Sequence, residues 1–175
     1  MPRGTSTDGT MVSIETDLKE VLDTLEEMGG RRSTMMRHLL SGIGTAAKGE
    51  VKRSYKGFGL SKGTGALYKS IQRKVFRNGK AVAVQAKARR NDGVFYGYAL
   101  AKGSAITARN GKWLTFQKDG KWVKVHSVKL PERNFVEAPV KAYLRSIGFQ
   151  NKVDELMEKE IRKIEKANAR KEASR

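Results

Sequence analysis

Two turn dipeptides constrain the fold of this chain more than any other feature of its sequence. Asn78-Gly79 and Asp119-Gly120 each divide a pair of runs that are rich in strand-forming residues. Both dipeptides suit the type I′ turn of a two-residue hairpin, because the central positions of that turn need a positive φ. The sequence therefore predicts two β-hairpins. Their strands are residues 71–77 with 80–88, and residues 112–118 with 121–130.

Helices are predicted before, between and after these strands. Apolar residues recur there at intervals of three and four, the period of an α-helix with one buried face. The predicted helices are 13–29, 33–52, 94–102, 140–147 and 151–169, and a polar loop is expected at 104–111. This order predicts the α+β class, with N-terminal helices, a small antiparallel sheet from two β-hairpins and C-terminal helices.

The 175 residues suffice for one domain with a hydrophobic core. We expect three parts, namely a flexible N-terminal arm at 1–12, an α+β assembly domain at 13–148 and a charged helical extension at 149–175. The last helix has an apolar stripe that includes Leu156, Ile161 and Ile164, and charged residues occupy its other faces. Such a stripe needs a partner, either the body of the domain or another subunit.

The net charge of +18 is concentrated in the middle of the chain. Residues 31–135 have 24 basic and four acidic side chains, whereas residues 1–30 have two basic and seven acidic ones. An excess of this size indicates a nucleic acid or an acidic partner, although a basic face that only maintains solubility would give the same pattern. The side chains expected to face DNA or an acidic neighbour are Arg89, Arg90, Lys112, Lys121 and Lys124.

The acidic first helix offers a second role for this charge. Glu20, Glu26 and Glu27 are candidates for contacts with the basic middle of a neighbouring subunit. Part of the basic charge would then serve assembly and not DNA.

Residues that usually carry catalysis or bind metals are scarce. The chain has no cysteine, which excludes disulfides, thiolate metal sites and cysteine nucleophiles. His38 and His126 are not spaced as metal ligands, and the four acids of the middle segment are too few for a two-metal nuclease. The glycine-rich stretch 57–65 lacks the spacing of a phosphate-binding loop. We therefore expect a protein that is not an enzyme and has no cofactor or metal.

Nucleic-acid contact, if it occurs, is expected to be sequence-neutral, because no base-reading motif accompanies the charge. Trp113 and Trp122 fit two interpretations, an aromatic stacking surface or anchors of the core of the small sheet. No apolar run approaches the length of a membrane span, and the first residues lack the pattern of a signal peptide. We therefore expect no membrane partner and synthesis in the cytosol.

Three segments resemble one protein family. They are GTGALYKSIQRKV at 63–75, FYGYALAKGS at 95–104 and VKLPERNFVEAPVKAYL at 128–144. In this order they resemble the minor tail, neck and tail-completion proteins of long-tailed bacteriophages, and the likeness covers about half the chain. The long acidic first helix, the polar insert at 105–111 and the charged last helix depart from the family pattern, so the position within the neck stays open.

The resemblance implies a structural virion protein at the head-tail junction, made in the cytoplasm of the host bacterium. It implies a homo-oligomeric ring of roughly six or twelve copies without catalytic residues. Its neighbours would be neck, connector and tail-tube proteins, and double-stranded DNA would pass through or close by. The alternatives are a free, sequence-neutral nucleic-acid-binding module and, less consistent with the few acids, a basic nuclease.

Overall fold

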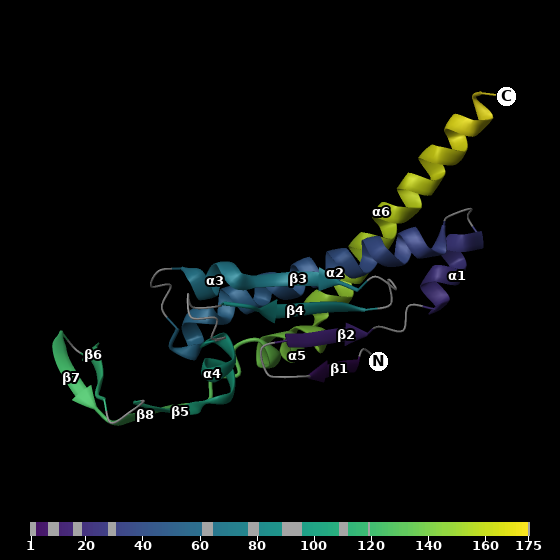
Figure 1. Cartoon of the computed structure of the whole chain (residues 1–175). Helices are drawn as coiled ribbons and strands as arrows, with labels where there is room; N and C mark the ends of the chain where they lie inside the picture. Colours follow the sequence, from purple (N-terminus) through teal and green to yellow (C-terminus); the bar gives the residue numbers. More distant parts are fainter. Residues whose placement is uncertain are drawn as a thin grey trace.

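The fold is a helix-backed antiparallel sheet with a β-ribbon at one end and a long helix at the other (Figure 1). We describe it from a computed structural model. The described residues are 3–6, 11–15, 19–27, 31–60, 65–76, 81–88, 96–108, 112–118 and 120–174. The N-terminal elements are β1 (Arg3–Ser6), β2 (Met11–Glu15), α1 (Lys19–Glu27), α2 (Arg32–Ser54), the 3-10 helix η1 (Tyr55–Phe58), α3 (Ala66–Ser70), β3 (Ile71–Val75) and β4 (Val82–Ala86). The C-terminal elements are α4 (Tyr96–Lys102), β5 (Ser104–Thr107), β6 (Leu114–Lys118), β7 (Lys121–Val125), β8 (Ser127–Leu130), α5 (Glu137–Leu144) and α6 (Ile147–Glu172).

The central sheet has four antiparallel strands in the order β1-β2-β4-β3. All five residues of β4 are buried, whereas three of the five residues of β3 are exposed. Helix α2 packs on β3 and β4 and also contacts α5 and α6. The sheet and these three helices therefore enclose one hydrophobic core.

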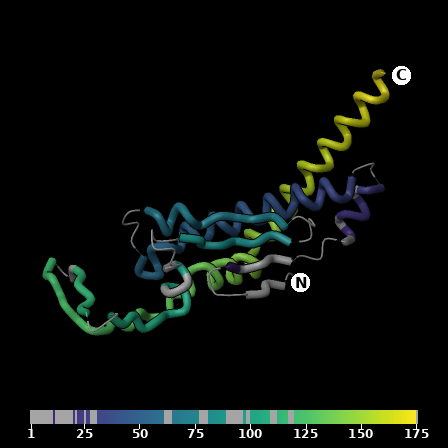
Figure 2. The backbone as a smooth tube through the Cα atoms, viewed as in Figure 1, coloured from purple at the N-terminus to yellow at the C-terminus, as the bar shows by residue number. Residues whose placement is uncertain are grey.

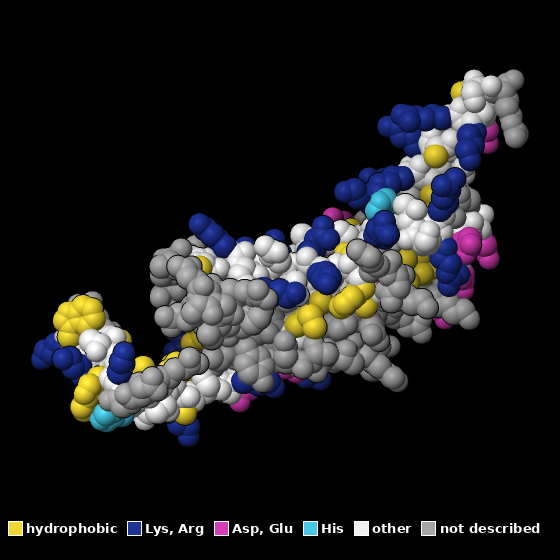
Figure 3. Space-filling model, in the orientation of Figure 1, with side chains coloured by type: hydrophobic (Ala, Val, Ile, Leu, Met, Phe, Trp, Pro, Cys, Tyr) yellow, Lys and Arg dark blue, Asp and Glu magenta, His cyan; other side chains and the backbone are white. Residues whose placement is uncertain are grey.

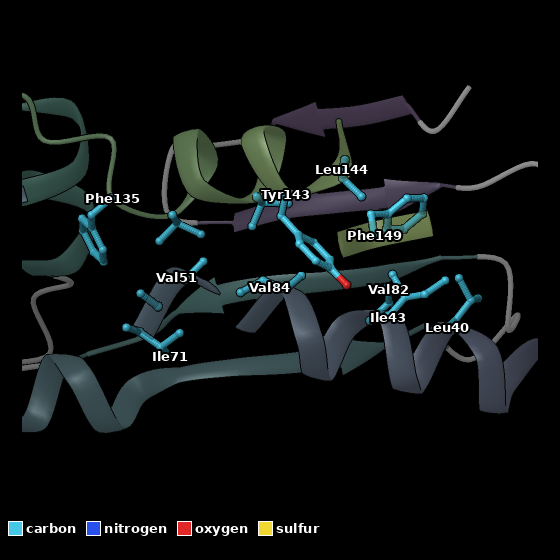
Figure 4. Close-up of a cluster of buried hydrophobic side chains, with 14 of the residues drawn as sticks. Leu40, Ile43, Val51, Ile71, Val82, Val84, Phe135, Tyr143, Leu144 and Phe149 are labelled. Carbon is cyan, nitrogen blue, oxygen red and sulfur yellow. The ribbon is translucent and has the colours of Figure 1, made fainter. Parts of the chain in front are cut away.

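The core is built from long aliphatic and aromatic side chains of several elements. Figure 4 shows residues of α2, β3, β4, α5 and α6 converging in it. Gly44 permits the close approach of α2 to the sheet, because a Cβ atom there would overlap Val82 Cγ2. Gly42 does the same for α6, since a Cβ would lie 2.5 Å from Leu156 Cδ1. The glycines that weaken helix α2 by propensity thus allow its packing.

The α+β class predicted from the sequence is confirmed, but the N-terminus differs from the prediction. Residues 1–12 were expected to be a flexible arm, and the structure places β1 and the start of β2 there. The helix expected at 13–29 begins only at Lys19, because residues up to Glu15 belong to β2. β2 pairs with the buried strand β4, whose backbone polar groups need partners on both sides. Pairing between distant segments therefore outweighs the local helical pattern.

Both predicted hairpin pairings occur, but they belong to different sheets. β3 pairs with β4 in the central sheet, and β6 pairs with β7 in a separate two-stranded ribbon. The turn at Asn78-Gly79 lies outside the described residues, whereas Gly120 has the expected positive φ of 77°. The long strand predicted at 121–130 is interrupted at His126, and its second part, β8, pairs with β5, where a polar loop was predicted.

The C-terminal helices form close to their predicted places. α5 begins at Glu137, so Pro139 lies in its first turn, where its missing N–H costs no helical hydrogen bond. The interruption expected at Gly148 occurs instead at Arg145 and Ser146. The Ser146 hydroxyl caps α6 by accepting a hydrogen bond from Phe149 N at 3.3 Å, and α6 continues to Glu172.

One acidic side chain of α6 is buried against α2. The Glu160 side chain is 8% exposed, with Oε2 3.1 Å from His38 Nδ1 and Oε1 2.5 Å from Lys163 Nζ. Burial raises the pKa of this carboxyl, but the hydrogen bonds of Lys163 and His38 outweigh it, so the pKa of Glu160 is lowered from its ordinary value of 4.5.

We expect Glu160→Gln to remove part of the acid sensitivity of folding. The folded-state pKa is lower than the unfolded one, so this stabilisation is complete above about pH 4.5 and is lost as the pH falls through the folded value. At neutral pH the variant should lose about 1–2 kcal/mol, as for other hydrogen bonds to charged groups. Urea unfolding at several acidic pH values, compared with the exposed-pair control Glu158→Gln, measures both effects. Equal pH profiles for wild type and Glu160→Gln would contradict the assignment.

Candidate functional site

A β-ribbon arm extends from one end of the body. It consists of residues 104–108, 112–118 and 120–130, and it contains the ribbons β5-β8 and β6-β7. Figures 1 and 2 show the arm standing away from the central sheet, at the opposite end from the C-terminus of α6. Among the described residues, no helix and no strand of the central sheet packs extensively on β6 or β7. The arm is therefore covered by no other part of the described fold to any large extent.

The base of the arm is held by backbone contacts. Gly103 has a φ of 71°, and a Cβ atom there would lie 2.9 Å from both Leu130 O and Glu132 N. The amides of Arg133 and Asn134 donate to Ala101 O at 3.3 and 3.2 Å. The end of α4 and the chain after β8 are thus joined directly, which sets where the two strands leave the body.

An aromatic cluster lies beneath this base. Phe135 is fully buried, and its ring meets Tyr55 edge to face with centroids 6.1 Å apart. Tyr55 meets Tyr68 in the same way at 5.4 Å. Arg133 Nη1 donates to Gly59 O at 2.6 Å, which connects the same turn to the end of η1. Leu130, on β8, is only half-buried.

The three segments that carry the family resemblance therefore meet at one place. Tyr68 comes from the first segment, Gly97 and Gly103 from the second, and Phe135 from the third. A Cβ on Gly97 would lie 3.2 Å from Ala86 O and 3.3 Å from Leu67 Cδ1, so α4 packs closely on β4 and α3. The residues of these motifs act structurally by joining the arm to the body.

The strand register gives the outer ribbon two different faces. Leu114 pairs with Val125 and Phe116 with Val123, and these four half-buried residues form the apolar face. Side chains alternate along a strand, so the intervening residues point to the other side. We call that side the aromatic face, and its described side chains are Trp113, Thr115, Trp122, Lys124 and His126.

The aromatic face is open to solvent. The Trp113 side chain is 56% exposed, and its ring stacks on His126 with centroids 3.8 Å apart and an interplanar angle of 30°. Trp122 is 73% exposed. The structure thus excludes the second interpretation of these tryptophans, because neither anchors a core.

The arm is also strongly basic. Residues 104–130 contain six lysines and arginines and one acidic residue. Lys112, Lys121 and Lys124, which the sequence predicts as contacts for DNA or an acidic neighbour, are all exposed on it. Figure 3 shows dark blue and yellow surfaces next to each other on the arm. Arg89 and Arg90, from the same prediction, lie outside the described residues.

The acidic candidates lie at the other end of the body, on α1. Glu20, Glu26 and Glu27 are exposed there. Glu26 Oε2 is 3.2 Å from Arg32 Nη1, and Asp23 pairs with the same guanidinium. Part of the acidic charge of α1 is thus already neutralised within the chain.

The apolar stripe of α6 packs within the chain. Ile164 is buried in the core, and Leu156 and Ile161 are half-buried against it. The sequence left two partners open for these three residues, the body of the domain or another subunit. The body of the domain covers the stripe, so no second subunit is needed to explain it. After Ile164, every described residue of α6 is exposed.

A groove of about 890 Å³ lies between α2, α5 and α6. Four hydroxyls line it. Three of them donate to a backbone carbonyl of their own helix or turn: Thr45 to Ser41, Ser54 to Glu50 and Ser146 to Tyr143. The fourth, the hydroxyl of Tyr143, is buried and has no hydrogen-bond partner among the described residues. The carboxylates of the groove are paired with basic neighbours, Glu50 with Arg53 and Glu155 with Lys152. Burial raises the pKa of Tyr143 at its wall. Among the residues described here, the groove offers no nucleophile beside a free base.

Comparisons with known proteins add no relative. No family model matches the chain, and neither the curated proteins nor the solved structures give a significant match. In the described parts of the chain, no helix is both long and apolar enough to cross a membrane. The described side chains also include no group of three or more histidines, cysteines or acids that could hold a metal ion.

The sequence indicates which residues form the aromatic face, but it does not indicate that this face is exposed to solvent. Side chains alternate along a strand, so residues two apart lie on the same side. In a hairpin centred on Asp119-Gly120, one side therefore contains Trp113 and Thr115 from the first strand and Trp122 and Lys124 from the second. Whether that side meets a helix or solvent depends on which elements pack on the hairpin, and this is a tertiary property.

Proposed function

We propose that this chain is a structural subunit of a tailed bacteriophage, located at the head-tail junction and assembling as a ring of identical copies. The observation that carries the proposal is the apolar face of the arm. An isolated two-stranded ribbon is at best marginally stable in water, and uncovered apolar surfaces commonly mark interaction sites. Within the described chain, no helix and no strand of the central sheet packs extensively on β6 and β7, which contribute the half-buried Leu114, Phe116, Val123 and Val125.

A neighbouring copy is the occupant that we propose for this face. The arm is basic and α1 is acidic, and they lie at opposite ends of the body, as a head-to-tail contact in a closed ring requires. The family resemblance supplies the location and the further partners. These are neck, connector and tail-tube proteins, with double-stranded DNA along the ring axis.

Polar substitutions on the apolar face should prevent assembly. We expect Phe116→Ser with Val123→Thr to convert an oligomer into smaller species, because the substitutions remove apolar area that a neighbour would bury. Native mass spectrometry of the full chain measures the change. Thr115→Ala, on the aromatic face of the same ribbon, is the matched control and should leave the oligomer mass unchanged.

Two results would refute the proposed function. One is a wild-type chain that stays monomeric at all accessible concentrations. The other is the absence of the protein from purified phage particles, measured by proteomics or by cryo-EM of virions.

A free, sequence-neutral nucleic-acid-binding module is the second candidate. The net charge of +18 and the basic arm favour it. A monomer that binds nucleic acid tightly at physiological salt would favour this function over the first.

A further inference from the structure

We propose that the aromatic face of the arm binds single-stranded nucleic acid by base stacking. The proposal concerns Trp113, Trp122, Lys124 and His126, and it goes beyond the assembly role, because it requires neither a ring nor the apolar face. The chemistry that would be recognised is an unpaired polynucleotide strand with accessible base faces.

The first argument is the exposure of two large aromatic rings. Trp122 is 73% and Trp113 56% exposed, although tryptophan is usually well buried in folded proteins. His126 holds one side of the Trp113 ring in a stack at 3.8 Å. Trp113 is therefore oriented before any ligand arrives, which lowers the entropic cost of stacking a base on it.

The second argument is the spacing of these groups along the ribbon. Trp122 pairs with Gln117, four positions from Trp113, so the two rings are separated by roughly 13 Å along the strand direction. Lys124 pairs with Thr115, midway between the two rings on the same face. A cation between two stacking positions is placed to neutralise the phosphates that join the stacked nucleotides.

The third argument is charge. Six of the seven charged residues between 104 and 130 are basic, histidine not counted, and Lys112 and Lys121 directly precede the two tryptophans. A basic surface with interleaved aromatic rings is the usual design of proteins that bind single strands without sequence preference. Charge complementarity thus favours a polyanion.

A duplex or an acidic protein would contact fewer of the groups on this face than a single strand would. In a duplex the bases stack on each other, so their faces are not available to the tryptophans, and only phosphate contacts would remain. An acidic protein surface would pair with the lysines and leave the ring faces without a specific role. These two partners are therefore outcomes of the test and not part of the proposal.

Tryptophan fluorescence gives a direct measurement, because the chain has two tryptophans and both lie on this face. The full-length protein would be titrated with a short oligothymidylate and with a duplex of equal length, at low and at physiological salt. We expect quenching by the single strand and weaker binding of the duplex. Trp122→Ala should weaken single-strand binding about 5- to 150-fold, the effect of losing one stacking ring.

Two further variants separate stacking from charge and from folding. Trp122→Phe should retain most of the affinity, because it keeps an aromatic ring. Ile147→Ala removes a side chain that is 74% exposed on the body and should leave the affinity unchanged. Lys124→Gln should make the affinity less dependent on salt concentration, by the amount expected for the loss of about one phosphate contact.

Either of two results would overturn the proposal. Equal affinity for duplex and single strand, unaltered in Trp122→Ala, would mean that only backbone electrostatics operate. Absence of single-strand binding would also refute it, and a loss of oligomer mass in Trp122→Ala would then assign the face to a protein contact. Assembly through the apolar face is tested separately by Phe116→Ser with Val123→Thr, so the failure of this proposal is distinguishable from failure of the proposed function.

Discussion

Phe135→Ala should destabilise the fold more than any other single substitution considered. The ring is fully buried and meets Tyr55 edge to face. Its removal loses the free energy of burying the ring and the aromatic contact, and it leaves a cavity in the core. We expect a loss of about 3–5 kcal/mol. For a chain of this length, that loss corresponds to a decrease in melting temperature of roughly 6–20 °C.

Thermal and urea unfolding measure this effect, at a protein concentration too low for assembly, because assembly would otherwise alter the apparent stability. Phe116→Ala on the arm is the matched control, since it removes the same ring from a half-buried site outside the core. It should change the global unfolding free energy by less than about 1 kcal/mol, because the arm opens locally. Similar losses in the two variants would mean that the cluster around Phe135 is not the centre of the core.

Gly103→Ala should have the second largest effect and should act on the base of the arm. An alanine in the left-handed region costs about 1–2 kcal/mol. Its Cβ would also lie 2.9 Å from Leu130 O and from Glu132 N, and these are backbone atoms that cannot rotate away. Overpacking of this kind adds about 1–3 kcal/mol, so we expect a total of about 2–5 kcal/mol.

Gly120→Ala separates the cost of the left-handed backbone conformation from the cost of the steric overlap. Gly120 has a similar φ of 77°, but a Cβ there would meet nothing within 4 Å. This control should show the conformational cost alone, about 1–2 kcal/mol. The destabilisation should be limited to the tip of the arm. If both variants lost the same stability in urea unfolding, the backbone contact at Gly103 would have no energetic role.

The sequence predicted the parts of the fold whose signals are local. The helical spacing around Leu39, Leu40 and Ile43 predicted α2, and the turn dipeptides predicted which strands pair. These features depend on neighbouring residues in the chain, so one sequence is enough to find them.

The sequence did not predict the parts that depend on distant segments. β2 exists because the buried strand β4 needs a second neighbour, and no local pattern around Met11 and Val12 indicates that need. The division of the run 121–130 at His126 likewise depends on the pairing of β8 with β5. For the candidate site, the sequence predicted Lys112, Lys121 and Lys124 as contacts for DNA or an acidic neighbour, and the structure shows that they are exposed. The exposure of Trp113 and Trp122 follows from the absence of a helix over the described ribbon.

The length of the arm has a consequence for how copies could meet. β5-β8 and β6-β7 follow each other with four and five residues per strand, which gives a reach of up to roughly 30 Å from the base at Gly103. That reach is close to the diameter of a small domain. A copy can therefore contact its neighbour before the two bodies touch, which widens the distance over which an incoming copy is captured. The gap between adjacent bodies would then be set by the arm and not by the fit of their surfaces.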